Sequence, residues 1–116
     1  MSVGVRSHIT THVLDAARGV PASGIEVTLE QRGVDSWTVI GTGRTDPDGR
    51  INELGPERVT AGRYRVTFDT GSYFAAQGTK TFYPEVTIVF EFDDESAHYH
   101  VPLLLSPFAY STYRGS

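Results

Sequence analysis

Short runs of alternating apolar and polar residues dominate the chain. Such alternation places successive side chains on opposite faces of a β-strand. In the first run, 8–15, Ile9 and Val13 fall on one face, and Thr10 and His12 fall on the other. Further strands are predicted at 25–30, 37–45, 50–52, 62–69, 85–92, 98–105 and 109–114.

Turn-forming residues separate these runs. Residues 46–49 read Asp-Pro-Asp-Gly, with proline where a turn needs a fixed φ and glycine at its close. One short helix is predicted at 72–77, with Thr70 or Ser72 as N-cap and Gly78 as the left-handed exit. Seven to eight strands with one helix predict an all-β fold, a two-sheet sandwich.

Length and composition fit a single globular domain over residues 1–116. The chain is 39% hydrophobic and 21% charged, with a net charge of −4. Lysine and arginine form no cluster larger than a pair, so neither nucleic acid nor an anionic membrane surface is an expected partner.

The absence of cysteine excludes disulfides and thiolate zinc sites, and it fits a reducing compartment. Residues 1–7 lack the apolar core of a secretory signal, and no apolar stretch is long enough to span a membrane. We therefore expect a cytoplasmic protein without a membrane segment.

Histidines are the first candidates for chemistry. A neutral imidazole at His12 would accept a proton near pH 7, although a solvent-facing strand histidine is the plainer reading. His98 and His100 are two residues apart on one strand, so their side chains point the same way, about 6.6 Å apart. With His12 as third ligand this pair would also suit zinc, but no acidic residue completes the set in the sequence.

Arg44 is a candidate hydrogen-bond donor to a substrate. Arg44 ends a strand before the 46–49 turn, and its planar guanidinium suits a substrate oxygen or a developing oxyanion. The alternative is a surface ion pair with Asp46 or Asp48.

The C-terminal residues form the other candidate group. The apolar run 101–105 would anchor the end of the chain, which makes Tyr113, with its ring and hydroxyl, a candidate wall of a pocket. Arg114 is expected to point to the opposite side, and the carboxylate of Ser116 would orient an imidazole. A frayed tail is the alternative.

Two segments resemble the transthyretin family: 11–22 is similar to its opening strand and turn, and 103–112 to its closing strands. Within that family, His12, Arg44, His100 and the Tyr-Arg-Gly-Ser end resemble the branch that hydrolyses 5-hydroxyisourate. The hormone carriers of the family differ at these positions.

This resemblance implies a transthyretin-like sandwich that assembles as a homotetramer, a dimer of dimers, with active sites in the channel between dimers. It implies conversion of 5-hydroxyisourate to 2-oxo-4-hydroxy-4-carboxy-5-ureidoimidazoline in urate degradation, without a metal or organic cofactor. The catalytic residues implied are His12, Arg44, His100 and Tyr113, and the substrate-binding residues are His12, Arg44, Tyr113, Arg114, Gly115 and Ser116.

A channel that binds a small ligand, as in the carrier branch, is the alternative function. The polar side chains of His12, His100 and Tyr113 would make such a channel poorly suited to a bulky apolar ligand.

Overall fold

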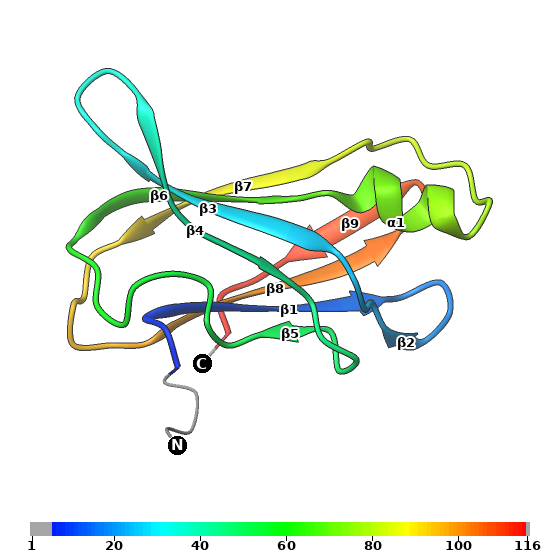
Figure 1. The fold of residues 1–116 in the computed structure, drawn as a ribbon, viewed down its shortest axis with the longest axis horizontal. Helices are drawn as coiled ribbons and strands as arrows, with labels where there is room; N and C mark the ends of the chain where they lie inside the picture. The colour runs from blue at the N-terminus through cyan, green and yellow to red at the C-terminus, as the bar shows by residue number, and fades with distance from the viewer. Residues whose placement is uncertain (1–5, 116) are drawn as a thin grey trace.

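The structure, a computed structural model, describes residues 6–115, which form two β-sheets packed face to face with one helix at their side (Figure 1). In chain order the elements are β1 (Ile9–Asp15), β2 (Val20–Pro21), β3 (Glu26–Arg32), β4 (Trp37–Arg44), β5 (Arg50–Ile51), β6 (Gly62–Phe68), α1 (Thr70–Ala76), β7 (Val86–Phe92), β8 (Tyr99–Ser106) and β9 (Ala109–Thr112).

The first sheet has the strand order β2-β1-β8-β9, and β5 also pairs with β1. Strands β1 and β8 are parallel, with Thr10 opposite His100 and His12 opposite Pro102, whereas the other pairs are antiparallel. The second sheet has the order β4-β3-β6-β7 and is antiparallel throughout. The parallel pair places the first strand of the chain beside one of its last two strands.

The core lies between the sheets and follows the alternation seen in the sequence. Alternate side chains of β1, β3, β6 and β8 are buried, whereas β4 has no buried residue. Burying each large apolar side chain contributes about 1.5–3 kcal/mol. The largest fully buried side chains on the strands are Ile9, Val13, Val27, Leu29, Tyr64, Phe68, Phe92, Leu103 and Leu105.

The predicted all-β sandwich is confirmed, and the predicted strands lie within about two residues of the observed ones. The last strand stops at Thr112 rather than Arg114. The helix begins at Thr70, and its N-cap is Asp69, not Thr70 or Ser72, because the Asp69 carboxylate accepts bonds from the Ser72 backbone N–H (3.2 Å) and hydroxyl (2.8 Å). Gly78 has a φ of +69°, as predicted.

The outer faces of the two sheets differ in chemistry. The outer face of the second sheet carries cross-strand ion pairs, whose partners neutralise each other: Arg44–Glu26, Arg63–Glu91 and Arg65–Glu30. The outer face of the first sheet carries histidines. No helix among residues 6–115 is long and apolar enough to cross a membrane.

A buried carboxylate connects the first sheet to the helix. Asp15, fully buried at the end of β1, accepts a bond from the Arg18 backbone N–H (3.0 Å). It also accepts a bond from the Tyr73 hydroxyl of α1 (2.7 Å). Burial, together with this bond, raises the pKa of Tyr73, so the hydroxyl stays protonated and donating.

Replacing Tyr73 by phenylalanine should therefore destabilise the fold. The change leaves the buried Asp15 carboxylate with one donor fewer, which costs about 1–3 kcal/mol. Urea unfolding at pH 7 measures this loss, with Tyr110→Phe, which removes a hydroxyl from an exposed tyrosine, as the control. Equal stability of the two variants would contradict a structural role for the Tyr73–Asp15 bond.

Candidate active site

The histidines predicted as candidates gather on the outer face of the first sheet. Because Thr10 on β1 lies opposite His100 on β8, side chains of the same parity on the two strands emerge next to each other. The ring centroids of His12 and His100 are 6.5 Å apart, and those of His98 and His100 are 6.3 Å apart. The structure thus brings all three imidazoles into one row.

Thr10 ties two of these rings together. Its hydroxyl oxygen lies 2.8 Å from Nδ1 of His100 and 3.0 Å from Nε2 of His98, and the residue is only 2% exposed. This leaves Nε2 of His100 as the ring nitrogen for a substrate or a water molecule. Sequence reasoning had placed Thr10 on the polar face without giving it a role.

His12 is oriented by the 46–49 turn. Its Nε2 lies 3.0 Å from the carbonyl oxygen of Asp48. A carbonyl oxygen only accepts, so Nε2 carries the hydrogen and Nδ1 of the neutral ring holds a lone pair. Gly49 makes the turn possible, because its φ is +77° and a Cβ there would lie 2.4 Å from the carbonyl oxygen of Val13.

The same turn delivers Arg50, a residue that the sequence analysis missed. Arg50 starts β5 and lies directly opposite His12 in the antiparallel pair of β5 and β1. Its backbone N–H donates to the Asp46 carboxylate (2.9 Å), which fixes the exit of the turn. The turn carries the chain from β4 of the second sheet to β5, which pairs with β1 of the first sheet. The available signal was the place of Arg50 directly after the Asp-Pro-Asp-Gly turn.

These residues border a small hollow, called here the histidine hollow. It has a volume of about 170 Å³ and is lined by Arg6, Thr10, Arg50, Asn52, His98 and His100. His12 lies beside it. Four of the lining side chains are neutral hydrogen-bonding groups, and the other two are guanidinium groups. This combination suits an anionic or strongly polar ligand.

The environment keeps these imidazoles neutral. Burial, and then the Arg50 cation, lowers the pKa of His12 below its ordinary value. Burial, followed by the neighbouring imidazoles and arginines, likewise lowers the pKa of His100, and burial and Arg6 lower that of His98. At pH 7 the row therefore consists of neutral rings that are able to accept protons.

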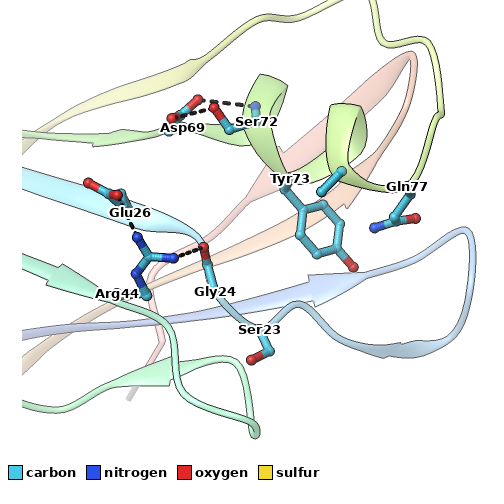
Figure 2. Close-up of a pocket in the computed structure, with 9 residues that line it drawn as sticks. Ser23, Gly24, Glu26, Arg44, Asp69, Ser72, Tyr73 and Gln77 are labelled. Carbon is cyan, nitrogen blue, oxygen red and sulfur yellow. Dashed lines mark hydrogen bonds and ion pairs between the residues drawn. The ribbon is translucent and has the colours of Figure 1, made fainter.

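Within one chain, Arg44 lies away from the histidines. It sits on the outer face of the second sheet, where it binds the Glu26 carboxylate (2.6 Å) and the Gly24 carbonyl oxygen (3.3 Å). Figure 2 shows its guanidinium in a separate cavity of about 340 Å³, which Tyr73 of α1 also lines. The alternative prediction of a pair with Asp46 or Asp48 is wrong, because Glu26 is directly opposite Arg44 in the sheet.

The C-terminal residues approach His100 from another side. The Gly115 backbone N–H donates to the His100 carbonyl oxygen (2.9 Å), and a Cβ at Gly115 would lie 2.7 Å from Cδ2 of that ring. Arg114 stacks its guanidinium 4.2 Å from the centroid of the Tyr99 ring. Tyr113, 59% exposed, lines a cavity of about 320 Å³ together with Arg114 and His100. Ser116 lies outside the described residues.

The histidine side chains of the row are not arranged to bind one metal ion. Within residues 6–115, no three histidine, aspartate or glutamate side chains lie close enough together to hold a metal ion. The Thr10 hydroxyl instead occupies one nitrogen each of His98 and His100. The arrangement is one of hydrogen-bonded imidazoles beside a guanidinium.

Comparison with known proteins agrees with this architecture. The model of the HIUase/Transthyretin family matches residues 9–115. A 5-hydroxyisourate hydrolase of Salmonella dublin is 51% identical over 109 residues, which cover 93% of this chain and 80% of that protein.

Two solved structures share the fold. Klebsiella pneumoniae 5-hydroxyisourate hydrolase matches with a TM-score of 0.83 and 35% identity, covering 93% of this chain and 98% of that one. Transthyretin from Sparus aurata matches with a TM-score of 0.89 and 40% identity, covering 95% and 97%. By sequence and by fold, the chain belongs to the HIUase/transthyretin family.

Proposed function

We propose that this protein is a hydrolase that opens the ring of 5-hydroxyisourate, as the names of its relatives indicate for those proteins. The observation that carries the proposal is the row of neutral imidazoles beside Arg50 on the outer face of the first sheet. Hydrolysis of a cyclic amide needs a base for water, a donor for the oxyanion and a rigid seat for the ring. The residues of the row offer the first two.

His12 is the proposed general base. The Asp48 carbonyl oxygen holds the hydrogen on Nε2, so the lone pair on Nδ1 takes the proton as water attacks the ring carbonyl. His100, whose ring lies 6.5 Å from that of His12, orients the water and shares the proton.

Arg50 is the proposed donor to the oxyanion, in place of Arg44. It lies opposite His12 and lines the histidine hollow with His100. A guanidinium stays charged at any working pH and offers a planar fork to the developing oxyanion. The amide bond then breaks, and the product proposed is 2-oxo-4-hydroxy-4-carboxy-5-ureidoimidazoline.

The remaining predicted groups complete the proposal. Tyr113 is a proposed catalytic and substrate-binding group, and Arg114, Gly115 and Ser116 are proposed substrate-binding groups. The histidine hollow is small and open, so we propose that a homotetramer, the assembly implied by the family resemblance, closes it with residues of a second copy. A cytoplasmic setting is proposed from the cysteine-free sequence.

A measurement of 5-hydroxyisourate hydrolysis distinguishes the proposed hydrolase from a protein that only binds a small ligand. Purified protein added to freshly oxidised urate should accelerate the loss of the ultraviolet absorbance of 5-hydroxyisourate. His12→Ala should lower kcat/KM by about 10²–10⁴-fold, the usual contribution of a general base, with an unchanged circular dichroism spectrum. No acceleration over buffer by the unaltered protein would refute the enzyme, and tight binding of an aromatic ligand in its place would favour a carrier.

Two arginine variants decide which guanidinium serves the reaction. Arg50→Gln removes the cation beside His12 and should lower kcat/KM by about 10²–10³-fold. Arg44→Gln breaks only an exposed ion pair and should leave kcat/KM within about threefold, since such pairs contribute about 0–1 kcal/mol. The reverse order of effects would restore Arg44 as the site residue.

The pH dependence follows from the lowered pKa of His12. The neutral ring persists below the ordinary histidine value of about 6.5, so the acid limb of kcat/KM should lie below that pH. Arg50→Gln removes a cation that disfavours the imidazolium and should shift the His12 titration upward. ¹H–¹⁵N NMR titration of the histidine rings measures the His12 pKa in the unaltered protein and in Arg50→Gln. A His12 pKa above 6.5 in the unaltered protein would contradict this electrostatic account.

A further inference from the structure

Thr10 touches two imidazoles at once. Its hydroxyl lies 2.8 Å from Nδ1 of His100 and 3.0 Å from Nε2 of His98. A hydroxyl has one hydrogen and two lone pairs, so it can donate to one ring while it accepts from the other. The three groups therefore form a continuous hydrogen-bonded chain along the sheet.

His100 and His98, the two ends of this hydrogen-bonded chain, face different surroundings. His100 lines the histidine hollow, with its Nδ1 occupied by Thr10. His98 lines the same hollow and also a second, open cavity of about 430 Å³, whose wall includes Glu57, Arg58 and Ser96. His98 thus stands between the proposed reaction site and water.

The reaction proposed above produces a proton. At neutral pH an amide and water yield a carboxylate, an N–H group and one H⁺. The ureido nitrogen of the product is not basic, so it does not retain this proton. One proton per turnover must therefore leave a site that two arginines already make positive.

We propose that Thr10 and His98 form the exit route for this proton, an inference that rests on the proposed function. The proton is taken up at Nε2 of His100. The hydrogen on Nδ1 of His100 then passes to the Thr10 oxygen while the Thr10 hydrogen passes to Nε2 of His98. His98 finally loses its Nδ1 hydrogen to water. Only N–H and O–H bonds change, and Thr10 is neutral before and after. Both rings end with the hydrogen on Nε2, and exchange with water restores the hydrogen to Nδ1 before the next turnover.

The surrounding charges favour transfer in this direction. His100 lies near His12, His98, Arg50 and Arg6, whereas His98 lies near His100, His8 and Arg6. Burial and these neighbours lower the pKa of both rings, so at pH 7 each has a lone pair ready to accept. A proton at His100 is repelled by the guanidinium groups of Arg50 and Arg6, whereas His98 has Arg6 nearby and shares the second cavity with the oppositely charged Arg58 and Glu57.

Thr10 acts through His100 and is a positioning residue in this scheme, which valine and serine substitutions test. Thr10→Val removes the hydroxyl and should lower kcat by about ten- to a hundredfold with KM nearly unchanged. Thr10→Ser keeps the hydroxyl and should retain kcat within about threefold. His98→Gln should reproduce the loss, and the double variant should be no slower than the slower single one.

Thr11 provides the matched control. It is the next residue of β1, is fully buried, and donates to the Val101 carbonyl oxygen (2.6 Å) on the core side of the sheet. Thr11→Val loses a buried hydroxyl in the same way but breaks no contact with the histidines, so its kcat should stay within about threefold of the unaltered protein.

Two further readouts report on proton transfer itself. Added imidazole buffer should restore part of kcat in Thr10→Val and in His98→Gln, and leave the unaltered protein unaffected. In ¹⁵N spectra of the free protein, Thr10→Val should change the tautomer populations of His98 and His100, whereas Thr11→Val should not.

The outcomes separate the exit route from the function. Full kcat in Thr10→Val, or equal losses in Thr10→Ser and Thr10→Val, would overturn the route while leaving the hydrolase intact. No turnover by the unaltered protein would overturn the function and the proton exit together. In that case the ¹⁵N spectra still decide whether Thr10 couples the two rings.

Discussion

The parallel pairing of β1 with β8 is the constraint on which the site depends. It joins strands about 90 residues apart in the chain, and its register sets Thr10 opposite His100. A shift by one residue would turn the histidines into the core and the apolar residues to solvent. The buried faces of both strands prevent that shift, so hydrophobic packing on one side of the sheet fixes the geometry of the polar side.

The two outer faces show how similar side chains acquire different roles. Arg44 lies opposite a glutamate and is neutralised within its own sheet. Arg50 lies opposite a histidine and forms no ion pair with any of residues 6–115. Its charge therefore acts on the imidazoles and lowers the pKa of His12 and His100. Neighbours across the strands, not residue type, decide which arginine is available.

Alternation in the sequence was enough to predict the sandwich, the strand limits and the shared face of His98 and His100, because these depend on local periodicity. The pairing of Arg44 with Glu26 and the place of Arg50 opposite His12 were not predicted, because strand pairing is a long-range property that one sequence does not display. The Thr10 bridge was hidden for the same reason, since its partners lie 88 and 90 residues away. The bond from the Gly115 backbone N–H to the His100 carbonyl oxygen and the stacking of Arg114 on Tyr99 have no local signal in the sequence.

The separation of β1 from β8 along the chain also affects how the protein folds during its synthesis. During synthesis β1 leaves the ribosome first, and its partner strand follows only after most of the chain has been made. Contacts between such distant segments carry a large loop-closure entropy and form slowly. Until β8 docks, one edge of β1 is open to strands of other nascent chains. Rapid completion of the last strands is therefore a condition for avoiding aggregation.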